Sequence, residues 1–504
     1  MGHPAVDVFW DGLAGYTCFR IPVLVSSVSG PLLSFAEARR GDCMDDAATD
    51  VVLRRSHDGG AHWTDVELVV PGLWDRHRVA GNLAPVQDRG TGRIWLPFNR
   101  GNYELWITFS DDGGATWAEP RGLNHLRKPW WTWVGFGPPG GVQLRSGRLL
   151  IPAYASSFPT YDNGLISSAF VVYSDDQGLT WQASALISNG HLPLLRGAFG
   201  NENQVAETEV DGELLMNSRT LFGTRLQSRS SDGGITWTAL RHVGGLPQPL
   251  EGCEGSLIAL DEGCRMLYSG VNAWGVFRTN LTVWASTDCG ESWAHALNPD
   301  ERSPVAGYSS MAVLANGTVA LLWERRDTWF QSLIPGPEYF PNLMSFRLLP
   351  AAMGTWNRIP LSGAHAPYKA HPMSWQVHGY RAFSGTAEFW ALLVGACLLF
   401  LVAAVRLIVV GRRLLKGRLS DGGGRFTWSQ LGLGAISGAW LGWDFLCTLN
   451  LLYFWDDDAA RWTCQAMYVC AFSAGLCAAA GVAYASDGCA AASPTSDGYC
   501  EMGA

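Results

Sequence analysis

Basic and acidic side chains are concentrated in one N-terminal stretch of the sequence. Arg20 lies in "CFRIPVL", and Arg39 lies in "AEAR", just ahead of the acidic loop "GDCMDD" that contains Asp45 and Asp46. An arginine presents a planar pair of N–H donors to a carboxylate and keeps its charge. A carboxylic acid nearby can donate or accept a proton. A local cluster of arginines can bind a small anion, although a single arginine is more often a solvated surface charge.

Other kinds of chemistry are poorly represented. The sequence contains no CxxC pair and no Cys/His cluster with zinc-site spacing, so neither a metal nor another cofactor is implied. A net charge of −9 disfavours a nucleic-acid binder, which needs a basic face. Cys253 and Cys264 could form a disulfide across a hairpin, and buried free thiols are an equal alternative. A hydrophobic fraction of 47% indicates a large buried core.

A repeated motif indicates which elements position these side chains. Asp can turn its carboxylate back onto backbone N–H groups, Gly can adopt a φ that other residues avoid, and Trp can pack between sheets. We therefore predict that each copy closes a hairpin and has a structural role. The pattern S-x-D-x-G-x-x-W occurs five times, beginning at Ser56, Ser110, Ser174, Ser230 and Ser286.

The spacing of the motif predicts the fold. Successive copies are 54 to 64 residues apart. Between them, short apolar runs such as "GRIWLPF" alternate with Gly, Asp, Asn and Ser turns, a pattern typical of β-strands. A regular repeat of strand-rich units indicates a β-propeller, and residues 1–350 have room for six units. The predicted fold is all-β, a six-bladed β-propeller.

The composition changes near residue 385. A polar segment rich in Pro and Gly reads as a linker, and the apolar runs beyond it are as long as a membrane-spanning helix. Buried helices of a soluble domain are the alternative, and Asp444 would be costly inside lipid. The predicted parts are a linker (351–387), a membrane region (388–486) with α-helical transmembrane segments at 389–410, 431–455 and 464–485, and a C-terminal tail (487–504).

Charge asymmetry predicts the orientation in the membrane. The loop 411–430 contains five basic residues, so the positive-inside rule places it in the cytosol and the propeller in the lumen or outside, in a lysosome or at the cell surface. Sequons at Asn280 and Asn316 are compatible with that side. The start, "MGHPAVDVFW", has no signal-peptide pattern, so either the natural chain begins upstream or its targeting is unusual.

The order of several short motifs resembles that of the exo-α-sialidases, in which the repeated motif is called the Asp box. FRIP, AEAR and LRRS precede the boxes, and "WWTWVGFGPPGGVQL", "ENQVAE", "NSRT", "FRTN", "GYSSM" and "LLWER" follow in order. The resemblance covers roughly residues 8–350 and is closest to animal lysosomal and cytosolic sialidases and their bacterial relatives. It implies a six-bladed propeller, in agreement with the repeat.

The resemblance also implies a binding site for the carboxylate of sialic acid. The family binds that group with three arginines, which here match Arg20, Arg219 and Arg278. The family's acid/base residue is an Asp after AEAR, which matches Asp45 when counted back from LRRS. Asp46 remains a close alternative because the acidic loop has no unique alignment.

The implied nucleophile is a tyrosine. Tyr308 in "GYSSM" matches it, and Glu202 in "ENQVAE" matches the glutamate that takes its proton, with Glu207 as the alternative. Sialic acid carries a carboxylate on its anomeric carbon, which would repel an anionic nucleophile, whereas a neutral phenol can approach. Sialidases are the glycosidases that use a tyrosine nucleophile.

Further matches concern residues around the site. Glu324 in "LLWER" matches a glutamate that orients Arg20. Arg39 is expected either to line the pocket near the sugar's substituents or to brace Asp45. The tryptophans at 130, 131 and 133 are expected to pack beneath the site rather than to stack on a sugar.

Together with the apolar segments, these matches predict a membrane-anchored exo-α-sialidase. It would hydrolyse terminal sialic acids from glycoproteins, oligosaccharides or gangliosides with retention of configuration, so the expected partners are sialylated glycans and a membrane. Because a fold does not determine a function, two alternatives remain. One is a non-catalytic, membrane-tethered Asp-box propeller that binds sialylated ligands, and the other is a trans-sialidase.

Overall fold

The structure is a computed structural model that describes residues 5–73, 78–156, 167–190, 199–221, 223–249, 251–260, 264–273, 278–300, 305–326 and 343–350. The chain divides into two units, Met1–Pro360 and Leu361–Ala504, and every described residue lies in the first. The predicted linker, transmembrane segments and tail all lie outside the described residues. Within these described ranges, no helix is both long enough and apolar enough to cross a membrane.

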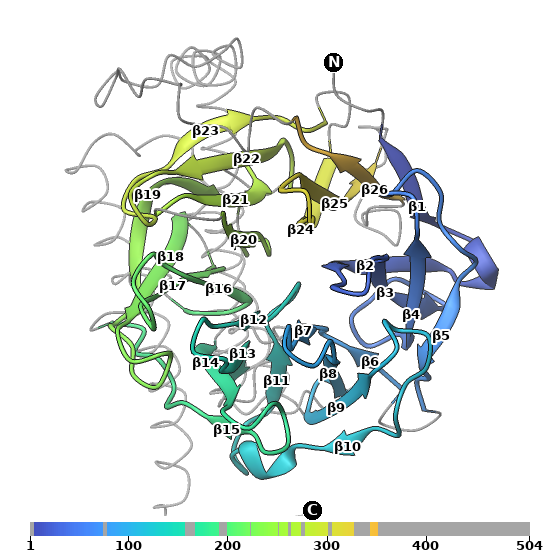
Figure 1. The fold of residues 1–504 in the computed structure, drawn as a ribbon, viewed down its shortest axis with the longest axis horizontal. Helices are drawn as coiled ribbons and strands as arrows, with labels where there is room; N and C mark the ends of the chain where they lie inside the picture. Colours follow the sequence, from blue (N-terminus) through green and yellow to red (C-terminus); the bar gives the residue numbers. More distant parts are fainter. Residues whose placement is uncertain are drawn as a thin grey trace, which may run out of the picture. The chain divides into compact units, whose positions relative to one another are not determined.

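The described residues form six antiparallel sheets, which Figure 1 shows arranged in a ring. The first sheet contains β2 (Cys18–Ser26), β3 (Leu32–Arg40), β4 (Ala48–Ser56) and β5 (Glu67–Val70). The second contains β6 (Ala80–Gly81), β7 (Val86–Gln87), β8 (Ile94–Arg100), β9 (Glu104–Ser110) and β10 (Arg121–Gly122). The third contains β11 (Trp133–Phe136), β12 (Val142–Gln143), β13 (Leu149–Ser156), β14 (Ser168–Ser174) and β15 (Gln182–Ala183).

The remaining three sheets complete the ring. The fourth contains β16 (Asn203–Glu207), β17 (Leu214–Ser218), β18 (Gly223–Ser230) and β19 (Arg241–Gln248). The fifth contains β20 (Ser256–Ala259), β21 (Met266–Val271), β22 (Leu281–Ser286) and β23 (Ala294–Leu297). The sixth contains β24 (Val305–Val313), β25 (Val319–Arg326), β26 (Leu343–Leu348) and β1 (Val6–Trp10). Two short 3-10 helices, η1 (Leu13–Gly15) and η2 (Asn124–Leu126), lie in connections.

The sixth sheet closes the ring with strands from both ends of the propeller. β1 pairs antiparallel with β26, with Val6 opposite Phe346 and Trp10 opposite Leu343. The first strand of the chain is thus the outermost strand of the last sheet (Figure 1). The two ends of the propeller are thereby held together within one sheet. The six-bladed propeller predicted from the repeat is confirmed.

The repeated motif forms the turn that was predicted. In the second copy, Ser110 Oγ donates to Asp112 Oδ1 at 2.7 Å and accepts from the backbone N–H of Gly114 at 2.8 Å. Asp112 Oδ1 also accepts from the backbone N–H of Thr116 at 2.8 Å. The Trp117 ring packs edge-on against Phe35 of the preceding sheet, with 5.7 Å between ring centroids. The motif therefore ties a hairpin turn to the neighbouring sheet.

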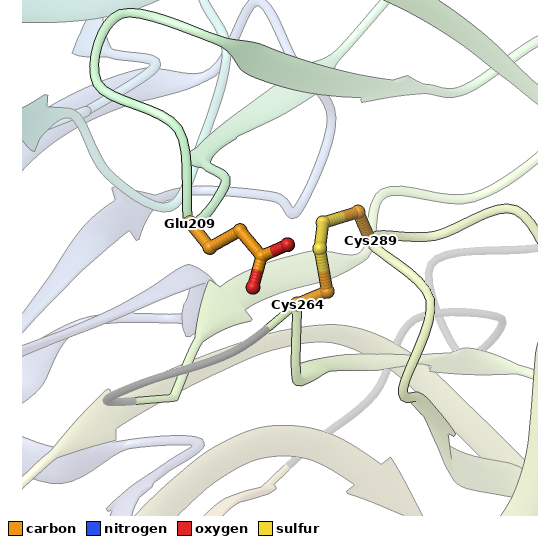
Figure 2. Close-up of side chains that lie close together, drawn as sticks. All are labelled: Glu209, Cys264 and Cys289. Carbon is orange, nitrogen blue, oxygen red and sulfur yellow. A yellow bond between two sulfur atoms is a disulfide. The ribbon is translucent and has the colours of Figure 1, made fainter.

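The cysteine pairing differs from the possibility raised by the sequence. A Cys253–Cys264 bridge is wrong, because Cys264 is bonded to Cys289 and Cys253 is a buried free thiol. Cys264 lies just before β21 and Cys289 just after β22, at the same end of two paired antiparallel strands, and their Cα atoms are 4.2 Å apart. Figure 2 shows this disulfide beside the Glu209 carboxylate. A second disulfide joins Cys18 to Cys43.

Candidate active site

The innermost strands bring distant parts of the sequence to one place. β2, β16 and β24 are each the edge strand of their sheet that faces the centre of the ring in Figure 1. Arg20 lies on β2, Tyr308 lies on β24, and Glu202 immediately precedes β16. The backbone N–H of Arg219 donates to the Glu202 carbonyl at 2.8 Å, which continues the β16–β17 pairing by one residue and places the two side chains together.

Tyr308 and Glu202 form a short hydrogen bond in a buried environment. The Tyr308 hydroxyl donates to Glu202 Oε1 at 2.5 Å. Arg219 Nη1 donates to Glu202 Oε2 at 2.7 Å and to the Tyr308 hydroxyl at 2.9 Å. Burial and the nearby Glu202 carboxylate raise the pKa of Tyr308 well above its usual value, although Arg219 and Arg278 act in the opposite direction. The phenol is therefore neutral at rest, with a proton acceptor already in contact.

Three guanidinium groups surround the Tyr308 ring. Arg219 contacts its hydroxyl, as described above. The Cζ atoms of Arg20 and Arg278 lie 5.3 and 5.4 Å from the ring centroid. Arg278 is held beside β24 because its carbonyl accepts the backbone N–H of Ala306 at 3.2 Å. The structure therefore brings together the three arginines that the sequence motifs singled out, in an arrangement suited to an anionic ligand.

Glu324 holds both Arg20 and the backbone of the tyrosine strand. Its Oε1 accepts from Arg20 Nε at 2.7 Å and from the backbone N–H of Ile21 at 3.0 Å. Its Oε2 accepts from the backbone N–H of Tyr308 at 3.0 Å. Both contacted segments are irregular, since the β2–β3 pairing shifts after Arg20 and the β24–β25 pairing shifts before Ser309.

The backbone around this glutamate is strained and closely packed. Ile21 has a φ of 61°, which a β-branched residue rarely adopts. A Cβ at Gly307 would lie 2.3 Å from Glu324 Oε2, so a glycine is required there. Such backbone outliers persist where surrounding contacts hold them, and they cluster at functional sites.

Asp45 lies in the loop between β3 and β4 and is held by Arg39. Arg39 Nη1 donates to Asp45 Oδ1 at 3.0 Å and to the Cys43 carbonyl at 2.5 Å, while its Nη2 donates to Glu37 Oε2 at 2.7 Å. The Asp45 side chain is 41% exposed. Burial raises the pKa of this carboxyl, but the positive charges of the nearby arginines, Arg39 first, outweigh burial and hold the pKa below its usual value. Of the two roles considered for Arg39, the contact with Asp45 is present.

The alternative acidic residues lie elsewhere. Asp46 is 77% exposed and pairs with Arg78 at 2.9 Å. Glu207, at the far end of β16, accepts backbone N–H groups of Arg145 at 2.8 Å and Gly212 at 2.9 Å. Asp45, rather than Asp46, therefore contacts Arg39, and Glu202, rather than Glu207, contacts Tyr308.

The tryptophan cluster is divided between core and surface. Trp131 is buried and packs on Phe170, with ring centroids 5.1 Å apart. Trp133 Nε1 donates to the Tyr154 hydroxyl at 3.2 Å. Trp130 is 63% exposed, so the packing expected of the whole cluster is wrong for this residue, which lies in the turn before β11.

The structure adds residues that sequence reasoning missed. Glu254 is buried and its Oε2 accepts the backbone N–H of Ser309 at 2.8 Å, while its Oε1 has no hydrogen-bond partner among the described residues. Burial raises the pKa of Glu254 well above its usual value. Tyr154 is also buried, and burial together with the Glu202 charge raises its pKa. Glu37 could have been found as the acid of AEAR, whereas nothing local distinguishes Glu254 in "EGCEGSL".

Comparisons with known proteins agree with this geometry. The family described as "BNR repeat-like domain" matches residues 30–321, more than half of the chain. Sialidase-2 of Cricetulus griseus is 30% identical over 341 residues, which cover 61% of this chain and 84% of that protein. Sialidase-4 of Homo sapiens is 31% identical over 268 residues, which cover 48% of this chain and 54% of that protein.

The chain thus spans about half the length of the Sialidase-4 relatives it matches. Among solved structures, the Hadza microbial sialidase Hz136 has a TM-score of 0.56 at 24% identity, covering 69% of this chain and 68% of that one. This likeness shows the fold. Taken with the family match and the similarity to Sialidase-2, it leads to one conclusion: the chain belongs to the exo-α-sialidase family of glycoside hydrolases.

Proposed function

We propose that this protein is an exo-α-sialidase that removes terminal sialic acids from glycoproteins, oligosaccharides or gangliosides by a retaining mechanism. The observation that carries the proposal is the hydrogen bond between the Tyr308 hydroxyl and Glu202, which Arg219 contacts from the same side. A nucleophile within hydrogen-bond reach of a base, with the base oriented by a third group, is the arrangement expected for covalent catalysis.

Substrate binding depends on the three arginines. The carboxylate of sialic acid would accept hydrogen bonds from Arg20, Arg219 and Arg278, which stand around the Tyr308 ring. This contact would place the anomeric carbon, which bears the carboxylate, next to the phenol. The Glu324 carboxylate keeps Arg20 in position and partly offsets its charge.

The first chemical step would form a glycosyl-tyrosine. The Tyr308 oxygen attacks the anomeric carbon while its proton moves to Glu202, and Asp45 protonates the departing glycosidic oxygen. In the second step, Asp45 removes a proton from water, which displaces the tyrosine, and Glu202 returns the proton to the phenolate. Two displacements at one carbon retain its configuration.

Asp45 must be protonated when it acts as the acid. The nearby arginines, Arg39 first, hold the pKa of the Asp45 carboxyl below its usual value. A bound carboxylate would offset the charge of Arg20 and Arg219, two of the groups that lower this pKa. Substrate binding would therefore raise the pKa of Asp45, so that this carboxyl is protonated when it must donate a proton to the leaving oxygen.

We further propose that the segments 389–410, 431–455 and 464–485 anchor the enzyme in a membrane, with the propeller in the lumen or outside, in a lysosome or at the cell surface. These segments lie outside the described residues, and the proposal depends on their hydrophobicity and on the basic loop 411–430. The two disulfides of the propeller support an oxidising compartment.

The test uses the purified full chain. We expect it to release 4-methylumbelliferone from a 4-methylumbelliferyl α-sialoside. The Tyr308→Phe variant should lose about 10²-fold or more in kcat. Tyr173→Phe is the matched control, because its hydroxyl lies on β14 and contacts Gln182. Proton NMR should show the α-anomer of sialic acid as first product. A folded parent that binds sialic acid without turnover would favour the receptor alternative, and transfer to added lactose would favour a trans-sialidase.

A further inference from the structure

The loop that carries Asp45 is connected to its surroundings by a small set of contacts, among them the Asp46–Arg78 ion pair at 2.9 Å. It spans residues 41–47 between β3 and β4. At its start, the backbone N–H of Gly41 donates to Thr17 Oγ1 at 2.8 Å. At its end, Asn102 Nδ2 donates to the Asp45 carbonyl at 3.0 Å. The middle of the loop is joined covalently to the sheet by the Cys18–Cys43 disulfide, with 5.9 Å between the Cα atoms.

The disulfide is attached to the strand that also carries a carboxylate-binding arginine. Cys18 and Arg20 are two residues apart on β2, so their side chains leave the same face of the strand. Cys18 lies opposite Arg39 in the β2–β3 pairing. The bond thus connects the loop to the strand that carries Arg20, at the position opposite Arg39.

One nitrogen atom links the disulfide to the acid. Arg39 Nη1 donates both to the Cys43 carbonyl and to Asp45 Oδ1. Because Arg39 is also held by Glu37, a movement of Cys43 away from β2 would break the first bond and carry Asp45 away from Arg39. The side chain of Asp45 is 41% exposed, so packing alone does not hold it.

We propose that the Cys18–Cys43 disulfide is a positioning device for Asp45, holding the loop where the acid can reach the departing oxygen. The inference rests on the proposed function, because it requires Asp45 to be the acid. It predicts a defect confined to proton donation. Carboxylate binding by the three arginines and attack by Tyr308 use other parts of the site.

The second disulfide provides a matched control. Cys264–Cys289 also joins residues 25 apart in sequence, as Cys18–Cys43 does. Removing either bond releases a loop of the same length in the unfolded chain, so the chain-entropy effect on stability is similar. Cys264–Cys289 lies between β21 and the turn after β22, beside Glu209 (Figure 2), and contacts none of the residues assigned to catalysis.

The experiment compares two leaving groups in the full chain. The parent, Cys18→Ser/Cys43→Ser and Cys264→Ser/Cys289→Ser are assayed on 4-methylumbelliferyl sialoside, whose phenol leaves without help, and on sialyllactose, whose sugar alkoxide needs a proton. We expect the 18/43 variant to lose about 10²-fold in kcat on sialyllactose and only about threefold on the aryl glycoside, with KM nearly unchanged. The 264/289 variant should match the parent on both substrates.

A second arm avoids substitution altogether. Reduction of the parent with tris(2-carboxyethyl)phosphine should produce the same selective loss, and reoxidation should reverse it. Among the described residues, the reduced 264/289 variant has only the 18/43 bond to lose, so it should show the loss as well. This arm decides the matter if the 18/43 variant does not fold.

Several outcomes would overturn the inference. Equal losses on the two substrates, equal losses in the two disulfide variants, or free thiols at 18 and 43 in mass spectra of unreduced peptides would each exclude a positioning role. A parent that cleaves neither substrate would overturn the proposed function itself. The two failures can be told apart. If only the inference fails, the parent still cleaves both substrates, and the variants show no selective loss on sialyllactose.

Discussion

Glu324 accepts the backbone N–H of Tyr308 at 3.0 Å, so the residue that pairs with Arg20 also fixes the main chain of the proposed nucleophile. Glu324, Arg20 and Tyr308 are all buried. A change at Glu324 therefore acts on carboxylate binding and on nucleophile position together.

Glu324→Gln should reduce both stability and activity. An amide at this position would present N–H donors to other donors and would remove the negative charge that pairs with the buried Arg20. Breaking a buried pair in this way costs about 3–5 kcal/mol of unfolding free energy. We expect urea denaturation to show a loss in that range and kcat/KM to fall by about 10²-fold. Glu207→Gln is the control, since this buried glutamate accepts the backbone N–H groups of Arg145 and Gly212 at the far end of β16 and should lose stability but keep its kcat.

Asp45→Asn and Asp46→Asn should differ sharply. Loss of a general acid costs about 10²–10⁴-fold, so Asp45→Asn should fall by that factor on sialyllactose and by less on an aryl sialoside. Asp46 is exposed and pairs with Arg78, so its variant should remain near the parent on both substrates. Steady-state kinetics on both substrates checks this, and a larger loss in Asp46→Asn would reassign the acid.

Asp45 should also contribute to the pH dependence of stability. Its folded-state pKa lies below the usual value, so the ionised form stabilises the fold above the unfolded-state pKa of about 3.9. That contribution is lost as the pH falls through the folded-state pKa. The unfolding free energy of the parent should therefore decrease more between pH 5 and pH 3 than that of Asp45→Asn. If urea denaturation shows the unfolding free energies of the parent and of Asp45→Asn changing equally with pH, the arginines do not stabilise the ionised Asp45 carboxylate.

Glu254→Gln should become relatively more stable as the pH rises. Burial raises the pKa of Glu254 well above its usual value, so the folded protein holds this carboxyl protonated. Its stabilising contribution is complete below the unfolded-state pKa of about 4.3 and is lost as the pH rises toward the folded-state pKa. The amide has no such loss and still accepts the Ser309 N–H. Thermal unfolding at pH 4 and pH 8 checks this, and a variant that loses stability equally at both values would contradict it.

The propeller could be predicted because its signal is local and repeated. Each Asp box is a short run in which Ser, Asp, Gly and Trp contact one another, as Ser110 and Asp112 do. The individual positions of Arg20, Arg219 and Tyr308 followed from motif order. In the sequence, only counting back from LRRS favours Asp45 over Asp46, because neighbouring residues in an acidic loop have no unique alignment. The structure distinguishes them by their contacts, Asp45 with Arg39 and Asp46 with Arg78.

The remaining features depend on contacts between distant segments. Cys253 and Cys264 are close in sequence, yet the pairing of β21 with β22 brings Cys264 to Cys289 instead. Glu254 becomes a buried hydrogen-bond acceptor only when β24 folds beside it and Ser309 donates its backbone N–H. Such environments arise from tertiary packing, which no pattern within one segment encodes.

The closure of the ring by β1 and β26 has a consequence for the order of folding. Tyr308 and Glu324 belong to the one sheet whose strands come from both ends of the propeller. During synthesis, β1 is made first, but it cannot pair until β26, more than three hundred residues later, has also been made. Joining such distant strands carries a large loop-closure cost and is slow. A nascent or truncated propeller that lacks β26 therefore has an incomplete sheet around its tyrosine, so catalytic competence would arrive as the last event of folding.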